Sequence, residues 1–364
     1  MAINYLKVGY NFTSELRDYI INKNSTSKKN VISEVYGSRA ESSVLSARPK
    51  FRIPDISRDE FKLHVKQLKE VGISFNYTLN ANYIGSKQYI LQYRDRIKDY
   101  IKFLIDCEVK TITVTIPLIA EYIRSVSTNM EIEVSTIAHL DTVTQVKIWK
   151  DYYGVNKISG NLYKNREIQF LKNLAQYCND NQVVLTLLAN EFCGNGQNEI
   201  HATNCIFRDH CYSLHSSDYN ADEKLDGDYP MGYCINSRNV GPVWLKMNFI
   251  RPEDMKLYNT IGINNFKITG RTATTKFTTR VTEAYLQEYY LGNLLDLWKH
   301  LETINSDNDA DYIPSCSIPN EKLNGFINFW FDNSSHVCAN EICGETCKYC
   351  DDYYASKFTK TNSF

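Results

Sequence analysis

The sequence predicts a (β/α)8 barrel of the TIM type followed by a small cysteine-rich C-terminal segment. Short runs of β-branched and aromatic residues alternate with amphipathic helical stretches, a pattern typical of strand-helix units that form a parallel sheet. Eight such strands occur before residue 270, and eight strand-helix units close a barrel. Residues 306–364 have too little apolar sequence to form a core of their own, and they contain four closely spaced cysteines.

The strands follow one another along the chain, and helical stretches fill most of the gaps between them. Strands are expected at 5–11, 31–36, 73–79, 111–116, 131–136, 156–159, 183–188 and 265–269. Helices are expected at 58–71, 86–107, 118–125, 141–153, 165–178 and 277–303. A doubly wound open sheet is the competing fold, but no glycine-rich dinucleotide-binding turn follows the first strand.

We expect two structural units, a barrel at residues 1–305 and a cysteine-rich segment at residues 306–364. The barrel carries a cysteine-rich insertion at 189–264, between its seventh and eighth strands. A loop of that length in a barrel is usually functional. The C-terminal segment needs a metal ion or a cluster to hold it in place.

The composition excludes some classes of protein. Lys plus Arg number 41 and Asp plus Glu number 42, so the net charge of -1 provides no basic field for coating nucleic acid. The N-terminal residues lack a signal-peptide pattern, and no apolar stretch approaches about 18 residues. We therefore expect a cytoplasmic protein without membrane association. In a reducing compartment its 11 cysteines form no structural disulfides, and most of them fall into two groups of four.

The first group of cysteines lies in the insertion. It comprises Cys193, Cys205, Cys211 and Cys234. Their spacing is too irregular for the short paired knuckles of zinc ribbons, whereas four thiolates from separate loops suit an iron-sulfur cluster. The alternative is that these are unligated cysteines in a long loop.

The second group lies near the end of the chain, at Cys338, Cys343, Cys347 and Cys350. The last three have the C-x3-C-x2-C spacing of radical S-adenosylmethionine enzymes. In those enzymes the motif precedes the barrel, whereas here it follows the barrel. We therefore expect a closed structural site for zinc or for a second cluster, with a reactive cluster as the alternative.

Charged residues at strand ends are candidates for substrate binding and catalysis. Lys267 and Arg271 flank the end of the eighth strand, where barrels commonly bind anionic groups. A buried ion pair with a strand-end carboxylate is the alternative. Glu191 follows the seventh strand and is a candidate general acid or base, or an acceptor that orients a donor. His201 and His210 are candidates for proton transfer or for donation to cluster sulfurs, although loop histidines are more often structural.

Several of these segments together resemble the peptidase family U32. The resemblance rests on residues 131–136, 154–159 and 266–271, and on Glu191, His201, Cys205, Cys211 and Cys234. The family also includes collagenase-like proteins and the iron-sulfur proteins of oxygen-independent ubiquinone and RNA hydroxylation. The resemblance implies a barrel with a 4Fe-4S cluster on four cysteines, and prephenate as oxygen donor.

The resemblance leaves one cluster ligand unassigned, because the family's fourth cysteine falls near Met255 here. Cys193 is the candidate replacement, and without it the cluster has an open iron. The function expected is an oxygen-independent, hydroxylation-type modification of a small molecule, a nucleic-acid base or a peptide. The alternatives are a U32-type peptidase and a non-catalytic iron-sulfur protein with a partner subunit. The first of these lacks the usual protease motifs, such as G-x-S-x-G and H-E-x-x-H.

Overall fold

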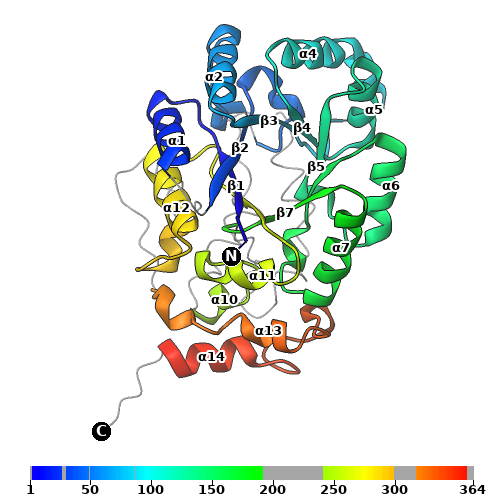
Figure 1. Cartoon of the computed structure of the whole chain (residues 1–364). Coiled ribbons are helices and arrows are strands. Elements are labelled where there is room, and N and C mark those ends of the chain that lie inside the picture. Colours follow the sequence, from blue (N-terminus) through cyan, green and yellow to red (C-terminus); the bar gives the residue numbers. More distant parts are fainter. Residues whose placement is uncertain are drawn as a thin grey trace, which may run out of the picture.

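The computed structural model describes residues 2–26, 30–48, 50–85, 87–191, 241–298 and 317–358. Strands β1 to β8 each pair in parallel with their neighbours in sequence, and β8 pairs with β1 to close a barrel (Figure 1). The strands are β1 (Tyr5–Gly9), β2 (Val31–Gly37), β3 (Ser74–Leu79), β4 (Thr111–Val114), β5 (Glu131–Val134), β6 (Lys157–Ser159), β7 (Val184–Leu188) and β8 (Asn265–Ile268). Each strand overlaps its expected range, and the predicted fold class is confirmed.

Helices surround the barrel and connect its strands (Figure 1). They are α1 (Ser14–Thr26), α2 (Arg58–Glu70), α3 (Lys87–Gln92), α4 (Arg94–Asp106), α5 (Pro117–Val126), α6 (Val143–Tyr153), α7 (Ile168–Asp180), α10 (Gly241–Leu245), α11 (Met255–Asn259) and α12 (Thr275–Gln287). Short 3-10 helices are η1 (Ala40–Leu45), η2 (Lys50–Arg52), η3 (Thr136–Ala138), η4 (Leu162–Lys164), η7 (Pro252–Asp254) and η8 (Leu294–Leu297). Helix α2 begins with a capping box in which Ser57 and Glu60 satisfy each other's backbone N–H groups.

The helices differ from the sequence expectation in several places. The stretch expected at 86–107 forms two helices, α3 and α4, which are separated at Tyr93. The stretch expected at 277–303 ends at Gln287, because Glu288 adopts a left-handed conformation with φ 53° and terminates α12. Helix α1 has no counterpart in the expectation, since only Leu16 and Ile20 of its thirteen residues are buried and its apolar pattern is weak.

The strands alternate between apolar and polar side chains. Leu6 and Val8 of β1 belong to the hydrophobic core, whereas Lys7 between them contacts Glu133 of β5. Because β1 and β5 are four strands apart in an eight-stranded barrel, this contact crosses the barrel interior. Barrel interiors are usually filled by Val, Ile and Leu, so a charged interior is a distinctive feature of this protein.

The carboxyl end of β1 lies against the turn that follows β8. A Cβ atom added at Gly9 would lie 2.4 Å from the backbone nitrogen of Arg271 and 2.8 Å from the carbonyl carbon of Gly270. Gly270 itself has a φ of 145°, which L side chains rarely adopt. Glycine at both positions therefore allows the backbone of Arg271 to approach β1 at the barrel mouth.

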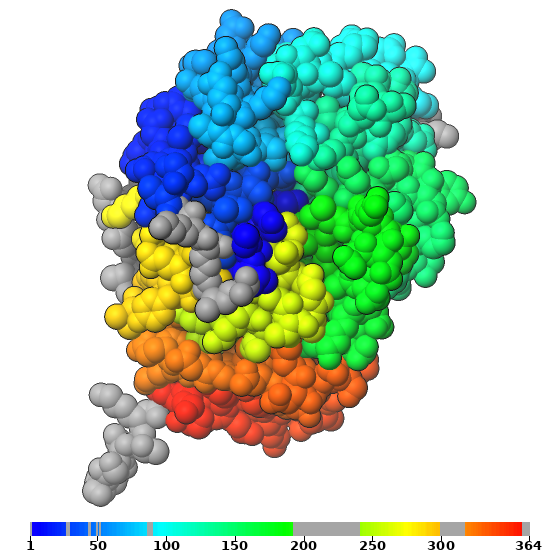
Figure 2. All heavy atoms as spheres, viewed as in Figure 1, coloured from blue at the N-terminus to red at the C-terminus, as the bar shows by residue number. Residues whose placement is uncertain are grey.

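The C-terminal segment packs on the barrel rather than standing apart from it. Its elements are η10 (Asn320–Leu323), α13 (Asn328–Asp332), η11 (Cys338–Asn340) and α14 (Tyr349–Phe358). Phe326 and Trp330 join the hydrophobic core of the barrel, and Phe326 stacks on Phe249 with ring centroids 6.4 Å apart. The segment forms one end of the molecule, beside α10 (Figures 1 and 2).

Two of the expected features fall partly outside the described residues. The expected boundary between residues 305 and 306 lies outside the described residues. In the insertion expected at 189–264, the described residues 241–264 contain α10, η7 and α11. No helix in the described ranges has the length and apolar character needed to cross a lipid bilayer.

Candidate functional site

The barrel interior contains a network of buried charges centred on Glu133. This carboxylate is fully buried and accepts hydrogen bonds from Lys7 Nζ at 2.8 Å, Asn76 Nδ2 at 2.7 Å and Ser159 Oγ at 2.5 Å. Lys267 Nζ lies 3.6 Å from its other side. Burial alone would raise the pKa of Glu133, but Lys7 and Lys267 hold it well below its usual value.

A second carboxylate extends the network toward the amino ends of the strands. Glu34 lies 3.4 Å from Lys7 Nζ and 2.9 Å from Lys157 Nζ. Lys157 also contacts Glu131 at 2.7 Å. Although burial opposes ionisation, Lys7 and Lys157 keep the pKa of Glu34 below its usual value. These groups neutralise one another, which is how proteins tolerate buried charge.

Lys267, predicted to bind substrate, belongs to this network. Its side chain is nearly buried, and its Nζ lies 4.2 Å from the centroid of the Tyr36 ring as well as 3.6 Å from Glu133. Burial lowers the pKa of Lys267. Lys267 therefore forms the buried ion pair that was the alternative to substrate binding, and its partner is Glu133. The structure leaves its substrate-binding role a prediction.

Arg271, the other predicted anion-binding residue, is placed differently. Its buried guanidinium donates to Ser38 Oγ at 3.3 Å and Ser46 Oγ at 3.2 Å, and it contacts the hydroxyl of Thr78. In the described part of the chain it has no carboxylate partner. Burial, followed by the nearby positive charge of Arg48, lowers the pKa of Arg271 to about 9.

Arg48 was not singled out from the sequence. It lies in the segment between η1 and η2, where its NH1 group donates to the carbonyl of Ala47 at 2.8 Å. Arg48 precedes Arg271 by 223 residues, so the sequence does not indicate that the two are close. Barrel closure brings β2 and β8 to the same mouth. Two cations at one mouth can bind an anion, and Arg271 is already surrounded by hydroxyl groups that can share its binding.

Glu191 lies near this mouth, just beyond β7. The preceding residue, Asn190, is anchored because its Oδ1 accepts from the Thr269 backbone N–H at 2.7 Å and its Nδ2 donates to the Leu297 carbonyl at 3.0 Å. The charge of Glu191 acts on Tyr36, whose pKa is raised mainly by burial. A carboxylate thus lies near the predicted anion site, as its proposed acid-base role requires.

The remaining predicted residues of the insertion lie outside the described residues. They are Cys193, Cys205, Cys211, Cys234, His201 and His210. Their convergence on one cluster stays a prediction. Met255, near which the family's fourth cysteine would fall, is fully buried in the hydrophobic core at the start of α11.

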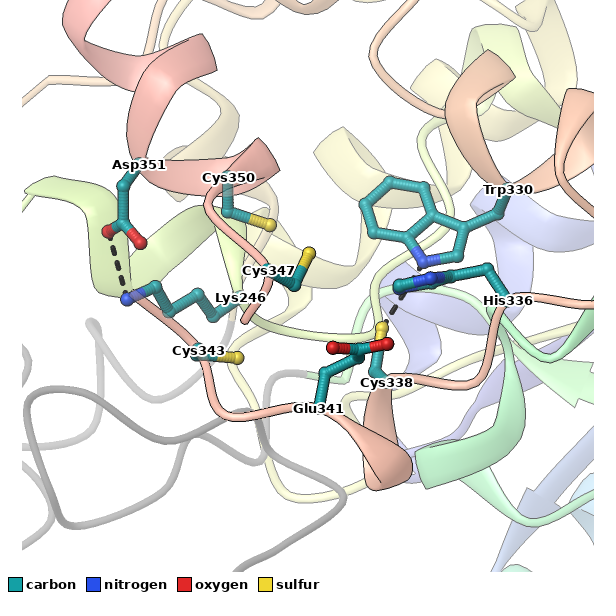
Figure 3. Close-up of a pocket in the computed structure, with 9 residues that line it drawn as sticks. All are labelled: Lys246, Trp330, His336, Cys338, Glu341, Cys343, Cys347, Cys350 and Asp351. Atoms are coloured by element: carbon teal, nitrogen blue, oxygen red, sulfur yellow. Dashed lines mark hydrogen bonds and ion pairs between the residues drawn. The ribbon is translucent and has the colours of Figure 1, made fainter. Parts of the chain in front are cut away.

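The four C-terminal cysteines line one small pocket, together with His336 (Figure 3). Cys338 lies in η11, Cys343 and Cys347 pair across an isolated β-bridge, and Cys350 lies in the first turn of α14. Burial raises the pKa of Cys338 to about 11 and also raises that of Cys350. Among the described residues, no three Cys, His, Asp or Glu side chains are already arranged to hold a metal ion.

Comparison with known proteins gives one family. Residues 25–293 match the family model described as Peptidase family U32. A curated relative, the Uncharacterized protease MJ1657 of Methanocaldococcus jannaschii, is 24% identical over 297 residues, covering 81% of this chain and 80% of the relative.

Solved structures give weaker likenesses. The U32 peptidase Mk0906 has a TM-score of 0.44 and 14% identity, over 64% of this chain and 83% of that chain. A GH113 β-1,4-mannanase has a TM-score of 0.39 and 11% identity, over 78% of this chain and 98% of that chain. Likenesses of this size carry no argument about chemistry.

Proposed function

Because the chain belongs to peptidase family U32, we propose that it is an iron-sulfur-dependent enzyme that modifies an anionic substrate in a hydroxylation-type, oxygen-independent reaction. One observation carries the substrate class. Arg271 is a buried cation at the barrel mouth whose partners in the described part of the chain are all neutral. Buried charges are normally paired, so the missing partner is expected to be a ligand.

The mouth suits a carboxylate or a phosphate group. Arg271 offers a planar donor fork, and Arg48 adds a second positive charge that acts on it. Lys267 lies deeper, beside Tyr36, where it is paired with Glu133. Prephenate, the oxygen donor implied by the family resemblance, carries carboxylates and would be one such ligand.

The proposed cluster would be held by Cys193, Cys205, Cys211 and Cys234, which fits the chemistry of a four-thiolate ligand set. A bound cluster of this kind supplies electron transfer. The segment that contains these cysteines begins directly after Glu191, at the carboxyl end of β7. Substrate binding by Arg271 and proton transfer by Glu191, with His201 or His210, would then act at one mouth.

A peptidase remains the alternative activity, since the family and its curated relative carry that name. The mouth gives it no particular support, because Ser38 and Ser46 both contact Arg271 rather than a histidine base. A non-catalytic iron-sulfur protein with a partner subunit is the other alternative. Binding of a peptide or an RNA substrate, and the cytoplasmic location, stay predictions.

The test separates anion binding from the cluster. Protein purified without oxygen is analysed for iron and sulfide, and its affinity for succinate and for inorganic phosphate is measured by calorimetry. A charge-assisted hydrogen bond contributes roughly 1.5 to 3 kcal/mol, so Arg271→Met should weaken binding about 10-fold to 100-fold while iron content is unchanged.

Arg124→Met is the matched control, because within the described ranges Arg124 donates only to carbonyl groups, such as those of Tyr153 at 2.8 Å and Met130 at 2.6 Å. It should lower the melting temperature without changing anion affinity. If Arg271→Met also lowers only the melting temperature, anion binding at Arg271 is wrong. If the wild-type protein holds neither iron nor sulfide but cleaves peptides, the hydrolase replaces the iron-sulfur enzyme.

A further inference from the structure

The pocket lined by the C-terminal cysteines does not include the residues of the barrel mouth, and it has no part in the proposed reaction. We propose that Cys338, Cys343, Cys347 and Cys350 bind one divalent metal ion, with zinc as the ion best suited to four thiolates, and that this ion fastens the C-terminal segment to α10.

The backbone around the pocket is built as a tight turn. The Gly344 N–H donates to the Cys347 carbonyl at 2.9 Å, and the N–H groups of Glu345 and Thr346 both donate to the Ile342 carbonyl at 3.0 Å. Gly344 has a φ of 87°, which favours glycine. This turn places Cys343 and Cys347 opposite each other across their β-bridge, so two ligands are presented by ordered backbone.

The other two cysteines approach the same space from different elements. Figure 3 shows Cys350 above the turn, at the start of α14, and Cys338 beside Trp330. Because no three donors converge within the described residues, the thiols must rotate inward to bind an ion. Rotation about a cysteine χ1 bond moves only the sulfur and leaves the backbone turn unchanged.

The size of the pocket favours a single ion over a cluster. Its internal volume is about 10 Å³, which is close to the space that one water molecule needs. A single ion needs less space than a 4Fe-4S cluster, which adds four irons and four sulfides. This narrows the expectation from the sequence, which left zinc and a second cluster open.

A buried cation nearby has no ion-pair partner among the described residues. Arg166 is 2% exposed, and its guanidinium lies 4.4 Å from the Trp330 ring centroid. Its NH1 group donates to the Leu245 carbonyl at 2.7 Å, but its Nε and NH2 atoms have no hydrogen-bond partner among the described residues. Burial raises the pKa of the Cys338 and Cys350 thiols, and the positive charge of Arg166 acts on both in the opposite direction.

Four thiolates and one divalent ion carry a net charge of -2, and the positive charge of Arg166 would offset half of it. Lys246, which also lines the pocket, is already paired with Asp351 at 2.9 Å. Trp330 Nε1 donates to Cys338 Sγ at 3.2 Å. An N–H donor to a ligating sulfur orients the ligand and stabilises its charge.

The C-terminal segment that the ion would hold packs on α10. Helix α14 packs on α10, and a Cβ atom added at Gly241 would lie 1.9 Å from the Tyr354 ring. The Lys246–Asp351 ion pair connects the same two regions.

The test uses full-length protein and measures zinc per chain after release of the metal from the thiols. Cys343→Ser and Cys350→Ser should each hold one zinc ion fewer than the wild-type protein and should be cut faster by protease within residues 317–358. The matched control is Cys178→Ser, a buried cysteine of α7 outside the pocket, which should keep the wild-type zinc content. Unchanged zinc in both pocket variants, or the loss of several irons with sulfide in place of one zinc, would overturn the proposal.

A milder variant covers the case in which the cysteine variants do not fold. Trp330→Phe keeps an aromatic ring in the core but removes the N–H group that donates to Cys338. We expect this variant to retain one zinc and to bind it about 10-fold to 100-fold more weakly in competition with a chelator. An affinity equal to that of the wild-type protein would show that Trp330 does not act on a metal ligand and would count against the site.

Discussion

Glu133 is the carboxylate at the centre of the barrel interior, and glutamine in its place removes the charge with little change in shape. In the wild-type protein it accepts from Lys7, Asn76 and Ser159, with Lys267 3.6 Å away. A glutamine offers one oxygen and one NH2 group, so at least one of these donors would face another donor.

We expect Glu133→Gln to lower the free energy of unfolding by about 3 to 5 kcal/mol, the cost of leaving a buried charge without its partner. Lys7 keeps Glu34 at 3.4 Å, whereas Lys267 loses its closest carboxylate. The loss should shrink when Lys7 is already methionine, because one ammonium that needs the carboxylate is then absent. Contacting residues of this kind couple by about 0.5 to 3 kcal/mol.

Urea unfolding followed by far-UV circular dichroism measures these differences, with the single and double variants of Glu133 and Lys7 forming a cycle. Glu121→Gln on the exposed side of α5 is the matched control, and it should change stability by less than about 0.5 kcal/mol. A loss below about 1 kcal/mol for Glu133→Gln, or the same loss with and without Lys7, would refute the reasoning, since the range expected is several times larger.

Three further predictions concern acid stability, the glycine at the barrel mouth and the reactivity of two buried cysteines. Because the pKa of Glu133 is held below its usual value, its stabilisation is present above about pH 4.3 and is lost on acidification, so melting temperature should fall less steeply below about pH 4 in Glu133→Gln than in the wild-type protein. Gly9→Ala should cost about 1 to 3 kcal/mol in urea unfolding and weaken succinate binding in calorimetry, because its Cβ would displace the backbone of Arg271; unchanged stability would contradict this. Burial raises the pKa of Cys107 to about 11 and that of Cys178 to about 12, so mass spectrometry should find both unmodified by iodoacetamide in the folded protein at about pH 8 and modified after denaturation.

The strands could be predicted because their signal is local. Runs such as 111–116 and 183–188 are rich in β-branched and leucine residues, and the observed strands fall within a residue or two of them. The end of α12 could not be predicted, because helix propensity continues past Gln287. Termination there depends on the left-handed conformation of Glu288, a non-glycine residue with no sequence signal for it.

Site residues could be predicted where their position in one segment was enough to identify them. Their partners could not be predicted, because the barrel brings them together from distant parts of the sequence. Position after the eighth strand was enough to single out Lys267 and Arg271. The partners of Arg271 come from segments about 190 to 230 residues away in sequence, such as Thr78 and Ser38. Lys7 and Glu133 are likewise 126 residues apart, so no local pattern marks them as a pair.

Two kinds of buried charge occur in this protein. One kind is paired within the chain and contributes to stability, and the other has uncharged partners and is a candidate for ligand binding. Lys7, Lys157 and Lys267 face Glu34, Glu131 and Glu133 in a network whose charges cancel. Such a network needs nothing from outside the chain, and Lys267 completes it. Arg271 and Arg166 are also buried, but their partners in the described part of the chain are uncharged.

An uncompensated buried guanidinium is costly, and arginine does not lose its charge by deprotonation as lysine can. The cost is tolerable if an anion completes the site. For Arg271 the anion would be a substrate group at the barrel mouth, and for Arg166 it would be the thiolates of the C-terminal pocket. The two proposed sites therefore rest on the same physical argument, but they are tested by different variants and different ligands, so either can fail without the other.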